Sequence, residues 1–252
     1  MQVKMILYFS ATGNSRLVAQ QLGERLGERV ADLRTCGEVR LADGECLGFV
    51  FPIHCWGIPP TVTQLIRRLQ TPVVPAYCYM VATCGDDTGL TAREWAALMS
   101  EKGFTADAQF SVQMPNTYVL LPGFDVDSPA LEARKLEAMP SRVDTIADLV
   151  RNRYRGDLTH HGKFARLKSK AIRPGFVKRI SDKKFHVDDS CRGCGRCAAN
   201  CPVGNIEIVD NRPRWKGNCI NCLACYHTCS HHAIAYGKAT ARKGQYNKLL
   251  KQ

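Results

Sequence analysis

Eight of the thirteen cysteines in this chain of 252 residues fall into two copies of one spacing, C-x-x-C-x-x-C-x-x-x-C. Three thiolates separated by two residues each can occupy three corners of a 4Fe-4S cube, but the chain cannot also return its fourth thiolate to that cube. The fourth cysteine of each copy therefore serves the other cluster. The prediction is a first cluster held by Cys191, Cys194, Cys197 and Cys229, and a second held by Cys219, Cys222, Cys225 and Cys201.

Two other uses of so many cysteines fit less well. Zinc sites normally draw paired C-x-x-C units separated by a longer loop, not this tripled spacing. An odd total of cysteines argues against a disulfide framework, and a reducing compartment favours metal ligation. Three histidines flank Cys229, and we interpret them as solvated side chains rather than ligands: His227, His231 and His232.

Net charge is unevenly distributed along the chain, and most of the positive charge lies in its last hundred residues. Residues 1–150 carry a net charge of −4, residues 151–184 carry +10 and residues 185–252 carry +6. Basic stretches of this kind are usually solvated faces or docking surfaces, and an acidic redox protein is a natural counterpart. Nucleic acid is a less favoured partner. No segment has the apolar length of a membrane span or a signal peptide, so we expect a cytoplasmic protein.

The first 150 residues alternate apolar runs with segments of helical period, which is typical of an α/β domain with a parallel sheet. We expect strands at 3–9, 29–33, 46–51, 77–83 and 110–114, and helices at 15–26, 61–69, 91–102 and 129–154. Pro140 should kink or split the last helix. Five strands with crossover helices predict a doubly wound sheet of order 2-1-3-4-5.

The predicted domains are residues 1–154, a basic connecting segment at 155–184 that packs in places, an α+β iron-sulfur domain at 185–237 and a basic tail at 238–252. Within the third part, 206–209 and 214–215 flank an Asp210-Asn211 turn and predict one hairpin.

A polar loop follows the first strand and leads into a helix; it comprises Ser10, Ala11, Thr12, Gly13, Asn14 and Ser15. Hydroxyls and backbone N–H groups at a helix amino terminus form an anion site. The loop lacks the Lys of a Walker loop and the three glycines of a dinucleotide fingerprint, so a phosphate monoester fits best. The alternative is an ordinary turn in which Asn14 or Ser15 caps the helix.

The stretch resembles the phosphate loop of flavodoxins, S/T-x-T-G-N-S/T, which binds the FMN phosphate. The resemblance covers residues 1 to about 150 and implies two further flavin loops after the third and fourth strands. The residues of these loops assigned to the flavin are Pro52, His54, Trp56 and Gly57, and Thr83, Cys84 and Gly85. Trp56 or His54 would supply a plate beside the ring, and the backbone around Cys84 the contacts to its polar edge; the alternatives are a rim hydrophobe, a loop histidine and an apolar filler.

Two features near these loops leave alternatives open. Cys55 and Cys84 end neighbouring strands, where they are either redox-active thiols or, as we favour, structural ones, since a reactive thiol needs an activating charge. A long segment at 115–127 leaves the same sheet edge. It covers the flavin, lines a substrate pocket through residues such as Tyr118, or docks the second domain.

Residues 185–237 resemble a bacterial two-cluster ferredoxin, with a departure at Ser230, where that family usually has Pro. The whole chain is similar to the flavodoxin-ferredoxin fusion proteins of anaerobic bacteria and archaea, which implies FMN and two 4Fe-4S clusters. Two functions follow as hypotheses: an oxidoreductase that reduces a small organic acceptor at the flavin, or a carrier that passes electrons to a separate reductase. Neither the acceptor nor the oligomeric state follows from the sequence.

Overall fold

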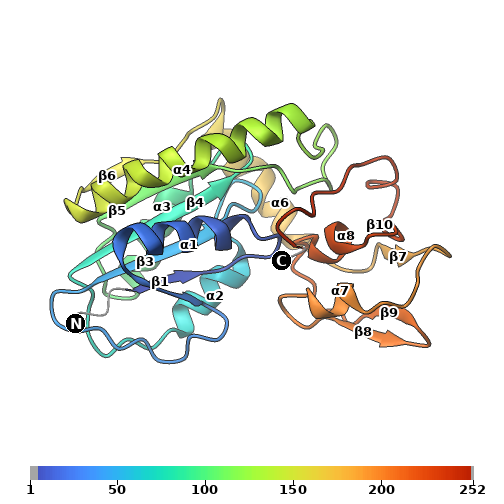
Figure 1. Cartoon of the computed structure of the whole chain (residues 1–252), viewed down its shortest axis with the longest axis horizontal. Coiled ribbons are helices and arrows are strands. Elements are labelled where there is room, and N and C mark those ends of the chain that lie inside the picture. The colour runs from blue at the N-terminus through green and yellow to red at the C-terminus, as the bar shows by residue number, and fades with distance from the viewer. Residues whose placement is uncertain (1–4, 251–252) are drawn as a thin grey trace. The chain divides into compact units, whose positions relative to one another are not determined.

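The computed structural model describes residues 5–250, which form two compact units (Figure 1). The first unit comprises residues 5–10, 14–114 and 133–177, and the second comprises 11–13, 115–132 and 178–250. The second unit is therefore built from three separate stretches of the chain. One of them is the segment at 115–132, which the sequence places next to the last strand of the α/β domain.

The first unit is built on a parallel sheet of six strands in the order β2-β1-β3-β4-β5-β6. Their bounds are β1 Met5–Tyr8, β2 Arg29–Asp32, β3 Cys46–Pro52, β4 Tyr77–Cys84, β5 Ala108–Gln113 and β6 Gly156–Leu158. The flavodoxin-like doubly wound α/β fold and the order of its first five strands are as predicted. The expected number of strands was wrong: β6 adds to the edge beside β5, and its three residues lack the apolar run that marks the other strands.

Helices cover both faces of this sheet: α1 Asn14–Leu26, α2 Pro60–Arg68, α3 Thr91–Glu101 and α4 Pro129–Arg151. Successive residues of a strand point to opposite faces. On β4, Cys78 lies against Met99 of α3, whereas the hydroxyl of Tyr79 reaches Glu28 just after α1. Arg25 of α1 pairs with Asp144 of α4, so α1 and α4 lie side by side on one face, in front of the sheet in Figure 1. The fully buried strand β4 lies at the centre of this core.

The last long helix differs from its prediction. It is one helix of 23 residues with Pro140 inside it, and it ends at Arg151 rather than at residue 154. Its buried residues, Met139, Val143, Ile146, Ala147 and Val150, recur at helical spacing on the side facing the core. We attribute its continuity to this packing, which offsets the hydrogen bond that a proline removes.

A continuous helical run follows β6, within the stretch predicted as a basic connecting segment that packs in places. It consists of α5 Ala165–Leu167, the π-helix η1 Lys168–Ile172 and α6 Arg173–Lys178. We call residues 165–178 the basic helical segment. Up to residue 177 it belongs to the first compact unit.

The second unit carries two antiparallel strand pairs and two short helices. Strand β8 (Ile206–Val209) pairs with β9 (Arg212–Trp215), and β7 (Phe185–Val187) pairs with β10 (Ile234–Tyr236). The first pair is the predicted hairpin. Its turn residues, Asp210 and Asn211, have φ values of 50° and 59°, as a two-residue hairpin turn requires. The helices are α7 (Arg196–Ala199) and α8 (Ala224–Thr228).

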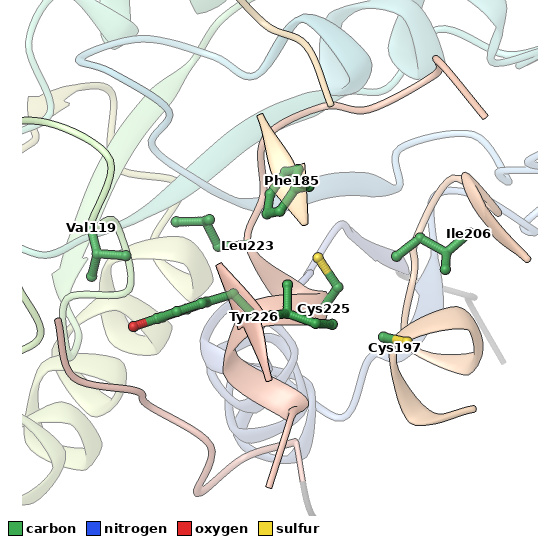
Figure 2. Close-up of a cluster of buried hydrophobic side chains, with 8 residues drawn as sticks. Val119, Phe185, Cys197, Ile206, Leu223, Cys225 and Tyr226 are labelled. Carbon is green, nitrogen blue, oxygen red and sulfur yellow. The ribbon is translucent and has the colours of Figure 1, made fainter. Parts of the chain in front are cut away.

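A small core holds this unit together (Figure 2). Val119, from the segment that follows β5, is fully buried in it together with Leu223 and Tyr226. Phe185 stacks on Trp215 at 5.4 Å, which joins β7 to the end of the hairpin. The long segment thus supplies part of the hydrophobic core of the iron-sulfur domain.

Candidate cofactor sites

The predicted phosphate loop lies between β1 and α1. Thr12, Asn14 and Ser15 are buried, and the hydroxyl of Ser15 lies 2.7 Å from that of Thr83 at the end of β4. Gly13 has a φ of 97°, a conformation that L side chains rarely adopt. A Cβ on Gly13 would lie 2.4 Å from the Cβ of Leu249. Both the backbone conformation and this close approach therefore call for glycine.

The loop after β3 makes a tight turn in which two residues carry positive φ values, Cys55 (50°) and Trp56 (60°). The N–H of His54 donates to the carbonyl of Gly57 across this turn at 3.0 Å. Non-glycine residues in this region of backbone space are strained and are often found where a loop is shaped for a ligand. His54 is buried and packs edge-on against Phe176 at 4.9 Å.

Trp56 is partly exposed and is covered on one side. The ammonium group of Lys168 lies 5.4 Å from the centre of its ring, within cation–π range. The backbone carbonyl of Trp56 accepts a hydrogen bond from Ser169. Which of Trp56 and His54 lies against a flavin ring stays a prediction.

The loop after β4 is held by charged and hydroxyl groups. The ammonium group of Lys135 donates to the carbonyl of Gly85 at 2.7 Å. The carboxylate of Asp87 accepts hydrogen bonds from the N–H groups of Gly89 and Gly162 and from Lys168. Burial alone would raise the pKa of Asp87, but these donors hold it below its ordinary value. Asp87 is thus an anion at neutral pH.

The two thiols at this edge of the sheet are not activated. Burial, together with the negative charges of Asp86 and Asp87, raises the pKa of Cys84 to about 12. Burial also raises the pKa of Cys55 to about 11, although Arg173 opposes this. Thiols with such pKa values are protonated at neutral pH, which favours the structural interpretation of both cysteines.

Three roles were predicted for the segment at 115–127: covering the flavin, lining a substrate pocket, or docking the second domain. The structure supports the last of these, because the segment packs as part of the iron-sulfur unit. Tyr118 is partly buried against the core that contains Val119 and Tyr226. The backbone N–H of Asn116 donates to the side-chain carboxylate of Asp127 at 3.0 Å, which closes the segment. The assignment of Tyr118 to the flavin stays a prediction.

His227 corrects the interpretation of the three histidines as solvated. It is fully buried, its Nε2–H donates to the carbonyl of Thr117 at 2.7 Å, and its Nδ1 accepts from the N–H of Tyr246 at 3.1 Å. Burial lowers its pKa to about 4, so the imidazole is neutral. It links α8 to the long segment and to the tail, where Tyr246 is itself buried. His231 and His232 are exposed, as expected.

One cavity of the second unit is lined by cysteines from both copies of the spacing. It lies among the loop at 191–197 and the side chains of Ile208, Pro213 and Ile234. The cysteines on its wall are Cys191, Cys194, Cys197 and Cys229. The fourth thiol comes from the second copy, and the grouping is the one predicted for the first cluster.

A second cavity has the reciprocal lining. Phe185, Ile206 and Trp215 contribute to its apolar wall. Its cysteines are Cys201, Cys219, Cys222 and Cys225. Backbone N–H groups already point to two of these sulfurs: that of Asn205 to Cys201 at 3.2 Å, and that of Asn221 to Cys219 at 3.3 Å.

The donor set of this second cavity fits a sulfur-rich cluster. The indole N–H of Trp215 is buried there without an oxygen or nitrogen acceptor among residues 5–250. Burial raises the pKa of Cys225 well above its ordinary value, and a hydrogen bond from Trp215 acts in the opposite direction. Within the described part of the chain, no group of three or more His, Cys, Asp or Glu side chains is arranged around the position of a single metal ion.

Two family models match the chain. A flavodoxin domain matches residues 5–119, and a 4Fe-4S dicluster domain matches residues 183–239. The chain is a flavodoxin-ferredoxin fusion. The first domain of the fusion implies FMN and the second implies two 4Fe-4S clusters, which makes the protein an electron-transfer flavoprotein with iron-sulfur centres.

Two solved structures are similar to part of the fusion. The Trp repressor binding protein from Bacillus subtilis is 15% identical, with a TM-score of 0.36, over 55% of this chain and 96% of that one. A protein from Bacteroides uniformis described as a flavoprotein is 16% identical, with a TM-score of 0.34, over 45% of this chain and 92% of that one. Among the curated proteins, none matched the fusion. No helix within residues 5–250 has the length and apolar character needed to cross a membrane.

The sequence did not predict the side chains of the basic helical segment that hold the loops after β3 and β4 in place. Arg173 donates to the carbonyls of His54 and Ile58, both at 2.6 Å, and pairs with Glu94 at 2.9 Å. Ser169 accepts a hydrogen bond from the N–H of Leu90 and donates one to Trp56. The only signal for them in the sequence was a stretch rich in Lys and Arg, which says nothing about where each side chain packs.

Proposed function

We propose that the fusion is an oxidoreductase in which electrons pass between the two 4Fe-4S clusters and FMN, and in which the flavin reduces a small organic acceptor. The observation that carries the proposal is the lining of the two cavities, each by three cysteines of one copy and the fourth of the other. This exchange ties the two clusters into one fold. When bound, the clusters supply one-electron transfer and the flavin supplies storage of an electron pair.

The residues of the chain have separate tasks in this proposal. Ser10, Thr12, Asn14 and Ser15, with the backbone at Gly13, would hold the FMN phosphate at the amino terminus of α1. The loops after β3 and β4 would border the ring. The backbone N–H groups of Asn205 and Asn221 and the indole of Trp215 would donate to cluster sulfurs. Such donors stabilise the more negative, reduced form of a cluster.

A second candidate function is a carrier that hands electrons from the flavin to a separate protein. The observation that favours it is that the basic helical segment packs on the predicted flavin loops of its own unit and also exposes basic and apolar side chains. A small organic acceptor does not need such a surface.

Two experiments test these functions in turn. Anaerobic reconstitution should give about eight iron atoms, eight sulfides and one FMN per chain. A colourless chain that takes up zinc instead would end both proposals. The reconstituted protein is then supplied with reduced ferredoxin and a panel of quinones, nitro compounds and enones. Steady reduction of one of them without another protein supports the oxidoreductase, and failure with all of them supports the carrier.

A further inference from the structure

The outer side of the basic helical segment combines exposed apolar side chains with unpaired positive charge. Phe164, just before the segment, is 74% exposed, Leu167 is 62% exposed and Ile172 is 44% exposed. No acidic residue lies between Asp157 and Asp182. Large exposed apolar patches that are rimmed by polar residues mark interaction sites.

The inner side of the same segment is fixed to the first unit. Ser169, Arg173 and Phe176 recur at intervals of four and three residues and contact the loops after β3 and β4. Lys168 pairs with Asp87 at 3.0 Å. Because these contacts hold the segment in place, its outer side chains are displayed in a fixed arrangement and do not trail from a free linker.

The positive charges of the outer side have no partners in the described chain. Lys163, Arg166 and Lys170 are exposed and form no ion pair with any of residues 5–250. Lys168 and Arg173, by contrast, point inward and are neutralised by Asp87 and Glu94. Two of the basic residues thus stabilise the fold, and the other three are available to a partner.

We infer that this outer side is the docking surface for an acidic electron-transfer protein, such as a small ferredoxin. The three basic residues would attract and orient the acidic partner as it approaches. An apolar patch at the centre of the partner's interface would pack on Phe164 and Leu167. The inference rests on the proposed function, since the docked protein would exchange electrons at the flavin loops. A bilayer or a nucleic acid would also attract the positive charge of this surface. Neither would explain why the surface is anchored to the loops after β3 and β4.

The test measures binding of the reconstituted fusion to an acidic plant-type [2Fe–2S] ferredoxin by titration calorimetry at low and high salt. The triple variant Lys163→Glu, Arg166→Glu and Lys170→Glu should weaken binding by about tenfold or more at low salt. The matched control reverses three exposed arginines of the first unit that lie outside the segment and form no ion pair within residues 5–250, Arg29, Arg68 and Arg134, with the same change in net charge. It should change binding by less than about twofold.

The apolar part is tested by Phe164→Ser with Leu167→Ser, which should weaken binding at high salt as well as at low salt. Carbodiimide should cross-link ferredoxin carboxylates to Lys163 or Lys170. Absence of ferredoxin binding, equal effects of the two charge reversals, or tighter binding to phosphatidylglycerol vesicles or duplex DNA would each overturn the inference. Iron and FMN are quantified in every variant, so that loss of cofactors, which would count against the proposed function, is distinguished from loss of docking.

Discussion

The hydroxyl of Ser15, in the first turn of α1, lies 2.7 Å from the hydroxyl of Thr83, at the carboxyl end of β4. These residues are 68 positions apart in the sequence, and both are buried. The bond joins the predicted phosphate loop to the predicted flavin loop after β4. The two loops therefore lie side by side at the carboxyl edge of the sheet.

Replacing Ser15 by Ala should destabilise the flavin-free protein by about 1 kcal/mol, since one buried hydrogen bond is lost. It should also weaken FMN binding, because the hydroxyl is one of the predicted phosphate donors. Thr83→Val removes the same bond but no phosphate donor. Urea denaturation should therefore give similar losses for both variants, and FMN titration should give a larger loss for Ser15→Ala.

Gly13→Ala should weaken FMN binding by about tenfold or more, because a side chain is strained at a φ of 97° and would contact Leu249. Gly27→Ala is the matched control: Gly27 also has a positive φ, 65°, but open space around its Cα. The control should cost about 1 kcal/mol of stability and leave flavin affinity unchanged. Equal flavin affinity in both variants would contradict a phosphate site at Gly13.

The exchange of fourth ligands between clusters is tested by pairs of serine substitutions. Cys191 and Cys229 line one cavity, so replacing both should remove one cluster and about four iron atoms. Cys191 and Cys201 line different cavities, so replacing both should disturb both clusters. Iron quantification and electron paramagnetic resonance would read the outcome. The reverse pattern would mean that each run of cysteines binds its own cluster.

Asp87→Asn should loosen the basic helical segment by about 1.5–3 kcal/mol, the range for hydrogen bonds to a charged group. The pKa of Asp87 is lowered in the folded protein, so its contribution is present above the unfolded pKa near 3.9 and is lost as pH falls through the lower folded value. Proteolysis between residues 160 and 178 should accelerate in the variant at neutral pH and in the parent protein only in acid. Asp86→Asn, at an exposed neighbour, should leave the cleavage rate unchanged.

His227→Phe should detach both the 115–127 segment and the tail, because it removes the acceptor for Tyr246 and the donor to Thr117. The expected cost is about 2–4 kcal/mol, with two buried backbone groups left unpaired. Limited proteolysis should then cut near Phe124 and after Thr240. His231→Gln, at an exposed histidine, should not alter the cleavage pattern.

The sequence by itself determined the two domain families, the cofactors they imply and the fold class. These follow from local patterns: a repeated cysteine spacing, a phosphate loop directly after a strand, and apolar runs that alternate with helical periods. The grouping of the cysteines around the two cavities agrees with the pairing inferred from their spacing. This pairing could be predicted because the distance that a short stretch of chain can span around a 4Fe-4S cluster is a local constraint.

Only the tertiary structure decided which distant residues meet. Strand β6 forms because the chain after α4 returns to the open edge of β5, and a three-residue strand leaves no pattern in the sequence. Val119 belongs to the core around Leu223, and His227 is buried by the segment that carries Val119. The separation of inward Lys168 and Arg173 from outward Lys163 and Arg166 depends on which acidic groups other loops bring near. Burial and partner choice are set by contacts between remote stretches, and no local period encodes them.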